Sequence, residues 1–138
     1  MNTELSTRKL HDIAHMGIRA TIGVIFIVHG FGKFGNPGFG GWISSMGIPA
    51  EMQIPIALAE FVPGILLLIG VLTRISGALL AIVMLGAIFL VKGATSLTGD
   101  SGYEFDLILL AVSLVVIVSG PGRVSISHLI KKIPRVLQ

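Results

Sequence analysis

Apolar residues gather in four long segments of the chain. These are residues 16–34, 54–72, 75–91 and 103–119, separated by short polar or glycine-rich stretches. A transmembrane α-helix needs about 20 consecutive, mainly apolar residues, so each segment predicts one membrane-spanning helix, with the fourth near the lower limit of length. The pattern therefore predicts an all-α membrane protein, in which a single domain over residues 1–138 forms an antiparallel bundle of four transmembrane helices.

The connections between the segments refine this prediction. Only residues 73–74 separate the second segment from the third, which favours a tight helical hairpin. The longest connection, residues 35–53, is rich in glycine and nearly uncharged, and its Trp42, Ile43 and Met46 share one helical face. Because tryptophan is enriched at membrane–water interfaces, we expect this outer loop to lie in the interface.

The last part of the chain predicts a helix that lies on the membrane rather than across it. Between residues 125 and 136, apolar residues recur with the i, i+3, i+4, i+7 spacing of one helix face, and three basic residues lie off that face. The apolar positions are Ile126, Leu129, Ile130 and Ile133, and the basic ones are Lys131, Lys132 and Arg135. A basic amphipathic helix of this kind binds the inner leaflet, and docking onto a partner protein is the alternative.

Composition excludes a water-soluble bundle. Apolar residues make up 53% of the chain and charged residues 12%, and the mean hydropathy is +0.92. Soluble domains carry about 25% charged residues, roughly twice as many. The chain has no cysteine, which excludes disulfides, thiolate metal sites and iron–sulfur clusters.

The basic residues predict the orientation of the helices. Lysine and arginine are enriched in the cytoplasmic loops of membrane proteins. Eight of the ten lie at the N-terminal, 73–74 and C-terminal side, and two lie on the opposite side. The eight are Arg8, Lys9, Arg19, Arg74, Arg123, Lys131, Lys132 and Arg135, and the two are Lys33 and Lys92. We therefore expect a multi-pass protein of the cell membrane with both termini in the cytoplasm, and the net charge of +3 has a topological origin rather than one in nucleic-acid binding.

Ionisable residues at one depth form the main candidate site. His29 and Lys33 lie four residues apart and so share a helix face, while Glu60 and Glu104 lie near the outer ends of the second and fourth helices. We call His29, Lys33, Glu60 and Glu104 the outer polar cluster and expect them to approach one another. Charge inside a membrane is costly and is either paired or functional. Two interpretations stay open: ion-pair contacts that hold the bundle together, or a site for a ligand or for proton transfer.

Three arginines form an inner layer. Arg19, Arg74 and Arg123 lie near the cytoplasmic ends of the helices. Arginines at this level often extend to lipid phosphates. Alternatively, Arg19 binds backbone carbonyls exposed at the end of the fourth helix, and a site for a specific anionic ligand is a third interpretation.

Haem and metal sites find no support in the pattern. His15 and His29 lie 14 residues apart on one helix, or roughly 21 Å, too far for both to ligate one haem. His11 and His15 are spaced to share a helix face, but two ligands make a weak metal site. We therefore predict no metal site.

An ordered series of short motifs resembles the DoxX family of small four-helix membrane proteins. The series consists of Arg19, His29-Gly30, Lys33-Phe34, Met46-Gly47-Ile48-Pro49, Ala59-Glu60, Gly70-Val71-Leu72-Thr73-Arg74, Gly102-Tyr103-Glu104-Phe105 and Gly120-Pro121-Gly122-Arg123-Val124-Ser125. It covers roughly residues 17–127. Pro63 departs from the family pattern, because a small or apolar residue is expected there, and proline removes a backbone donor near Glu60.

The resemblance implies a function in membrane oxidoreductase systems. Related proteins include the membrane subunits of archaeal thiosulfate:quinone oxidoreductase. A quinone head group would suit the outer polar cluster, because His29, Lys33 and Glu104 could hydrogen-bond its carbonyl oxygens. No intrinsic redox centre is visible in the sequence, so electrons would come from a partner subunit or a bound cofactor.

Other functions stay open at this point. The protein could be a non-catalytic structural or assembly subunit of a larger membrane enzyme, or a transporter of protons or small solutes. The expected partners are membrane lipids, together with further copies of the chain or other subunits of a membrane complex.

Overall fold

The protein is helical throughout the part of the chain that the structure describes. The structure, a computed structural model, describes residues 2–100, 102–122, 125–126, 134 and 136–137. The α-helices are α1 (Asn2–Phe34), α2 (Pro37–Ser44), α3 (Gln53–Ile69), α4 (Thr73–Gly86) and α5 (Glu104–Ser119). A 3₁₀ turn, η1 (Ala50–Met52), precedes α3, and a π-helical turn, η2 (Ala87–Val91), continues α4. The predicted all-α class is confirmed.

Three of the helices are long and apolar enough to cross a membrane. They comprise Lys9–Phe34, Ala50–Ile69 and Thr73–Val91. With 16 residues, α5 is shorter than these three. The predicted segments agree with the helices to within three residues, except that α1 begins at Asn2 rather than at residue 16. The polar residues before Met16 end the apolar run without ending the helix.

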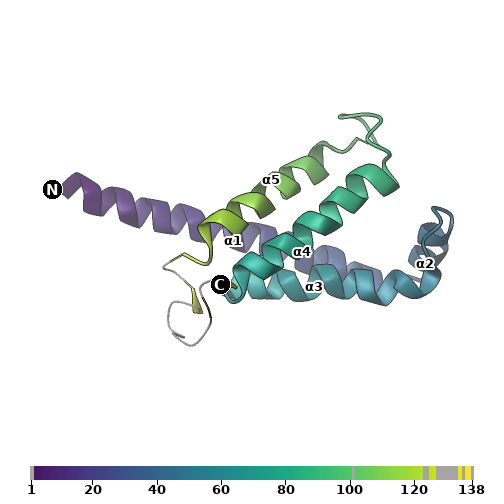
Figure 1. Cartoon of the computed structure of the whole chain (residues 1–138), viewed down its shortest axis with the longest axis horizontal. Coiled ribbons are helices and arrows are strands. Elements are labelled where there is room, and N and C mark those ends of the chain that lie inside the picture. The colour runs from purple at the N-terminus through teal and green to yellow at the C-terminus, as the bar shows by residue number, and fades with distance from the viewer. Residues whose placement is uncertain (1, 101, 123–124, 127–133, 135, 138) are drawn as a thin grey trace.

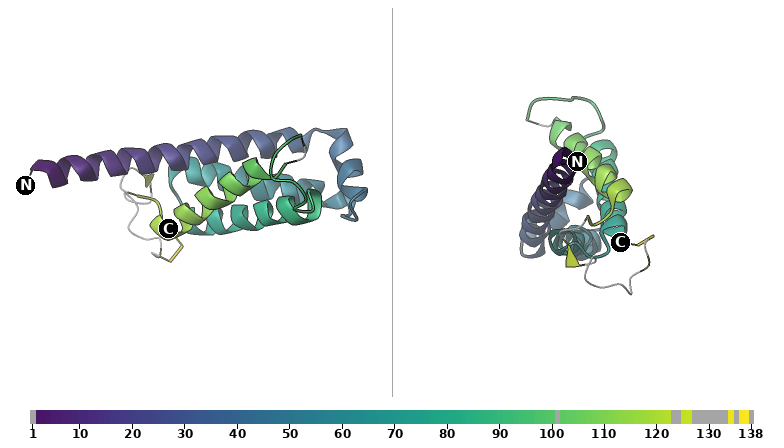
Figure 2. Two further views of the ribbon diagram at one scale, coloured as in Figure 1. Left: turned by 90° about the horizontal axis from the view of Figure 1, so that it is seen from above. Right: turned by 90° about the vertical axis from the view of Figure 1, so that its left-hand side faces the viewer.

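The long helices pack in a chain of neighbours. In Figure 1, α1 lies along α3 and α4 lies along α5, while α3 and α4 are joined by a short turn and pack against each other. The N-terminal part of α1 projects beyond the other helices (Figures 1 and 2). Contact between α1 and α5 is much sparser than between α1 and α3, between α3 and α4, or between α4 and α5. The helices thus form an open arrangement with a gap between the first and the last.

Glycines set the closest helix contacts. A Cβ atom on Gly23 would lie 2.8 Å from the carbonyl oxygen of Gly64, and one on Gly30 would lie 2.6 Å from the amide nitrogen of Phe61. Only residues without a side chain let α1 and α3 approach so closely. On α4, a Cβ atom on Gly77 would lie 3.1 Å from the carbonyl oxygen of Ser113 on α5.

The core between the helices is apolar and continuous. It contains Ile22, Phe26, Leu67, Leu80, Met84, Leu109 and Val116. Many further apolar side chains point outward: Val28, Ile82 and Ile108 are each more than 60% exposed. A helical protein that is apolar on its outside as well as its inside suits lipid rather than water.

The turn between α3 and α4 is as tight as the sequence predicts. Gly70 adopts a left-handed conformation at φ 75° and closes α3 through hydrogen bonds to the carbonyls of Leu66 and Leu67. Leu72, also left-handed at φ 50°, precedes the first turn of α4. A side chain on Gly70 would collide with Ser125 and approach the guanidinium of Arg19, so glycine serves both the turn and the packing.

The outer loop contains the helix α2, and the side chains that this helix buries differ from the predicted face. Phe39 and Ile43, one turn apart on α2, are buried, whereas Trp42 is 50% exposed. Trp42 and Ile43, predicted to share one helical face, therefore differ in their surroundings, because Ile43 packs against the protein. The position of the loop in the membrane interface stays a prediction. The amphipathic helix predicted for residues 125–136 falls largely outside the described residues, as does Arg123.

Candidate functional site

An ion pair between α1 and α3 forms the centre of the candidate site. The ammonium group of Lys33, in the last turn of α1, binds Glu60 Oε1 on α3. Glu60 is only 2% exposed, so the lysine places its positive charge against a buried acidic side chain. The second oxygen, Oε2, is buried and has no hydrogen-bond partner. Unpaired buried oxygens are rare in proteins and call for an explanation.

The surroundings of Lys33 hold the end of α1 in place. Its ammonium nitrogen lies 5.5 Å from the centre of the Phe39 ring on α2, within the range of a cation–π contact. The Gln53 side chain donates hydrogen bonds of 2.8 Å to the carbonyls of Lys33 and Asn36. The carbonyl of Lys33 lies in the last turn of α1, where helical donors run out. The carbonyl of Asn36, the N-cap residue of α2, also accepts a 3.2 Å hydrogen bond from the amide of Phe39. The first residue of α3 thus fixes the end of α1 beside Glu60.

A second ion pair joins α4 and α5. Lys92 Nζ lies 2.5 Å from Asp106 Oδ2 and donates a 2.9 Å hydrogen bond to the carbonyl of Gly102. Asp106 is 8% exposed. Lys92 follows the π-helical turn η2, and its amide donates to the carbonyl of Ala87 five residues earlier. We call the end of the molecule that holds Lys33 and Lys92 the lysine end.

The other two residues of the outer polar cluster are placed differently. His29 is exposed, and its ring centre lies 6.4 Å from that of Phe26 and 6.0 Å from that of Phe105 on α5. Glu104 is exposed at the first position of α5. Its backbone N–H donates a 3.0 Å hydrogen bond to the carbonyl of Leu97, while its carboxylate has no ion-pair partner among the described residues. The structure therefore joins Lys33 to Glu60, brings His29 to α5 and leaves Glu104 at the surface.

Helix geometry explains why α5 pairs through Asp106 rather than Glu104. Successive residues are about 100° apart around a helix, so two positions separate these acids by roughly 200°. Asp106 lies in phase with the buried residues Leu109, Ser113 and Val116 of α5. That i, i+3, i+7, i+10 spacing is visible in the sequence and could have identified Asp106 as the buried acid.

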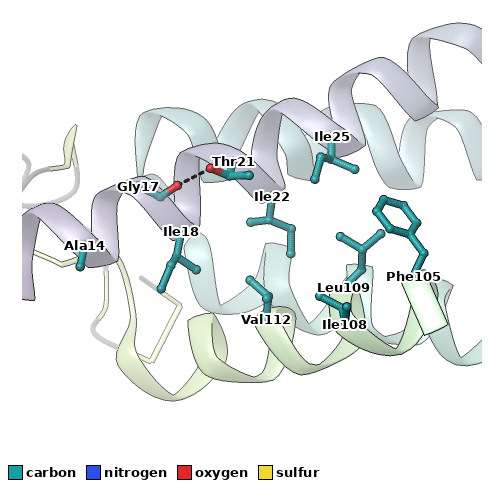
Figure 3. A pocket seen from close by; sticks show the side chains of 10 residues that line it. All are labelled: Ala14, Gly17, Ile18, Thr21, Ile22, Ile25, Phe105, Ile108, Leu109 and Val112. Atoms are coloured by element: carbon teal, nitrogen blue, oxygen red, sulfur yellow. Dashed lines mark hydrogen bonds between the residues drawn. The ribbon is translucent and has the colours of Figure 1, made fainter.

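An apolar groove lies between α1 and α5. It has a volume of about 440 Å³ and is lined chiefly by Ala14, Gly17 and Ile22 of α1 and by Phe105, Leu109 and Val112 of α5 (Figure 3). We call it the α1/α5 groove. The groove was not predicted, because apolar residues that line an open groove look the same in a sequence as those that fill a core.

At the opposite end of the molecule, which we call the arginine end, Arg19 of α1 binds α3 and the segment that follows α5. Its side chain is 2% exposed, Nε donates a 2.8 Å hydrogen bond to the carbonyl of Leu67, and Nη1 donates to the carbonyl of Pro121. The predicted bond to a carbonyl at the end of the last helix is confirmed. Extension of Arg19 to lipid phosphate is wrong, because the guanidinium is buried and donates to these two backbone carbonyls.

A histidine–serine contact also lies at the arginine end. His15 Nε2 lies 2.7 Å from Ser119 Oγ on α5. Because the Ser119 hydroxyl donates to the carbonyl of Val115, it accepts the hydrogen bond from His15. Nδ1 of His15 is buried beside Gly122, where an added Cβ would lie 2.6 Å away. Among the described residues, no group of three acidic or histidine side chains could hold a metal ion.

Comparison with known families identifies this helical protein. The DoxX family model matches residues 14–93, more than half of the chain. The chain belongs to the DoxX family. The match runs from α1 to just beyond η2 and so contains the Lys33–Glu60 pair, while α5 lies beyond it.

Relatives of this DoxX protein are bacterial and are similar along most of their length. The Bacillus subtilis protein named "Putative oxidoreductase CatD" is 37% identical over 81% of this chain and 83% of its own. The inner membrane protein YqjF of Escherichia coli is 30% identical over 91% and 98%, and the membrane protein Rv3486 of Mycobacterium tuberculosis is 34% identical over 83% and 80%. No solved structure matches the chain. These relatives, with the apolar helices, make this DoxX protein a membrane protein.

Proposed function

We propose that this DoxX protein is an integral membrane subunit of an oxidoreductase system and that its outer polar cluster binds a quinone-like head group. In this proposal α1, α3, α4 and α5 cross the cell membrane as an antiparallel bundle, and both termini are cytoplasmic. A relative named as an oxidoreductase supports the class of system. The apolar exterior supports a ligand that arrives from lipid.

The observation that carries the proposal is the unpaired oxygen of Glu60. One carboxylate oxygen is held by Lys33, and the other is buried without a donor. Burying such an oxygen costs about 1–3 kcal/mol or more for a charged group. An ionisable residue retained inside a membrane protein at that cost points to function. A ligand hydroxyl bound there, or a proton taken up there, would satisfy the oxygen.

The residues around Glu60 suit the chemistry of a quinone. A quinone supplies two-electron redox chemistry when bound, and its reduction needs stabilisation of charge on its oxygens and delivery of protons. Lys33 and His29, one turn apart on α1, are the donors. Glu60 takes up and passes on a proton at its unpaired oxygen, and Glu104, exposed beside Phe105, exchanges protons with water. Electrons come from a partner subunit or a cofactor bound to it.

Substitution of Glu60 tests this role. We expect Glu60→Gln and His29→Ala to lower quinone reduction by the purified native complex roughly a hundredfold, the size of a lost proton-transfer group. Glu51→Gln is the matched control, because Glu51 is an exposed carboxylate in η1. If both cluster variants keep full activity and normal assembly, the site does not exist.

A structural or assembly subunit is the second candidate. It is favoured by the position of the two ion pairs, each of which joins two helices and neutralises a buried acid. This role predicts that Glu60→Gln lowers the amount of assembled complex while activity per complex is unchanged. If native protein also fails to bind a quinone analogue, the cluster is a structural brace and the proposed site is wrong.

A further inference from the structure

We propose that the α1/α5 groove holds the tail of the quinone, a single extended isoprenoid chain, and that the tail leads to a head group beside His29. This inference rests on the proposed function for the identity of the head group. Its own basis is the shape and chemistry of the groove (Figure 3).

The size of the groove fits one chain and not a helix. Along α1 the lining runs from Ala14 to Ile25, or roughly 16 Å at the helical rise per residue. The volume of about 440 Å³ lies within the range of about 300–1,000 Å³ for small-molecule sites. A helix about 10 Å wide would occupy roughly 1,200 Å³ over that length. The groove is therefore too small to be filled by a helix from a second copy of the chain.

The lining of the groove is suited to hydrocarbon along its whole length. Its floor is formed by Ile22 and Leu109, which are 2% and 3% exposed. The one lining residue with a polar side-chain group is Thr21, and its hydroxyl donates a 2.7 Å hydrogen bond to the carbonyl of Gly17. Since that hydroxyl is already satisfied within the helix, the groove presents no group that would bind a polar ligand.

The polar end of the groove is at His29. Phe105 lines the groove, and its ring contacts the imidazole of His29, which is exposed and lies one turn before Lys33. At the opposite end, Arg19 is committed to backbone carbonyls and His15 to Ser119. An amphiphile would therefore place its head at His29 and its tail toward Ala14.

Glycines on α1 offer a matched pair of test substitutions. Gly17 lines the groove and Gly32 does not, and at both positions an added Cβ meets no atom within 4 Å. Gly17→Leu fills the groove, while Gly32→Leu adds the same side chain to an exposed position of the same helix. Ile108→Trp fills the groove from α5, in case Gly17→Leu alters the fold.

The test measures binding to the full chain in lipid nanodiscs of two probes: an isoprenoid benzoquinone and the same benzoquinone without its tail. We expect Gly17→Leu to weaken binding of the tailed quinone roughly tenfold and leave the tail-free quinone unchanged, with Gly32→Leu neutral for both. Unchanged binding of the tailed quinone in Gly17→Leu and Ile108→Trp overturns the tail site. Equal competition by a fatty acid of matched length overturns the isoprenoid assignment. If native protein binds neither quinone, the proposed function itself fails.

Discussion

Two buried acids dominate the energetics of the lysine end. Glu60 and Asp106 are nearly inaccessible, and each is neutralised by a lysine from the neighbouring helix. Removing one partner of a buried pair leaves an uncompensated charge, whereas removing both can be nearly neutral. The two lysines therefore matter less as attractive contacts than as counter-charges to the buried acids.

Lys33→Met should destabilise the protein by about 3 kcal/mol, because it strands the Glu60 carboxylate inside the helices. The double variant Lys33→Met/Glu60→Gln should recover most of that loss. Unfolding of the purified protein in detergent, followed by circular dichroism, measures both. Equal stabilities for the single and double variants would show that the two side chains are not coupled.

Arg19→Lys should lower stability by about 2 kcal/mol, because the shorter lysine carries one nitrogen in place of the Nε and Nη1 atoms that reach the carbonyls of Leu67 and Pro121 separately. Arg74→Lys is the control, since Arg74 Nε has no hydrogen-bond partner. Both changes keep the positive charge. If the two variants are equally stable, the positive charge of Arg19 matters and its hydrogen bonds to the two carbonyls do not.

At the residue scale, the sequence predicted part of the candidate site. The matched depth of Lys33 and Glu60 was readable from their distances to the helix ends, and the structure joins them. We did not predict that Glu104 faces outward, although the spacing of the buried residues of α5 includes Asp106 and leaves Glu104 out. Of the two partners of Arg19, only a carbonyl at the end of the last helix was predicted. The carbonyl of Leu67 was not, because a backbone acceptor inside an apolar segment gives no sign of its role in the sequence.

At the scale of elements, glycine spacing controls how the helices meet. Gly23 and Gly30 lie on the face of α1 toward α3, where Gly64 and Phe61 leave no space for a side chain. This contact holds Lys33 within reach of Glu60. The close contacts at Gly23 and Gly30 were not predicted, because single glycines within a long apolar run do not show which helix they face.

Gly30→Ala should therefore destabilise the protein by about 1–3 kcal/mol, the cost of forcing atoms into a packed contact. Gly32→Ala, two residues later, faces open space and should be neutral or slightly stabilising, because alanine favours helix. Thermal unfolding of the two variants side by side makes the comparison. Equal stabilities would contradict the close packing of α1 on α3.

The positions of the long helices were largely predictable from the sequence, whereas the π-helical turn and the buried face of α2 were not. Long apolar runs fix where helices lie, so three predicted segments agree with helices long enough to span a membrane. The π-helical turn η2 gives no sequence signal, because Ala87–Val91 is uniformly apolar. The buried face of α2 was misjudged, since tryptophan suggested an interface while Phe39 and Ile43 pack inward.

At the scale of the whole molecule, four crossings with cytoplasmic termini remain the prediction of the charge pattern. The 16 residues of α5 extend roughly 24 Å, short of the ~30 Å hydrocarbon core, so the fourth crossing requires local thinning of the bilayer or residues beyond the ends of α5. The open side between α1 and α5 is a second whole-molecule property. It depends on how four helices pack together, which no single segment of sequence records.

The topology can be tested directly because the chain has no cysteine. Thr98→Cys lies between η2 and α5, and Val136→Cys lies near the C-terminus. A membrane-impermeant thiol reagent added to intact cells should label the first and not the second. Labelling of both from the same side would refute four crossings.

The most direct measurement for the central claim is photochemical cross-linking of a quinone to the purified chain. A benzoquinone with a photoreactive group on its ring is bound to the full chain in nanodiscs, and the modified peptides are mapped by mass spectrometry. The account predicts saturable labelling of α1 around His29 and of α3 around Glu60, competed by unlabelled quinone and lost in Glu60→Gln. Labelling that is absent, not saturable or confined to the outward face of α4 would contradict it.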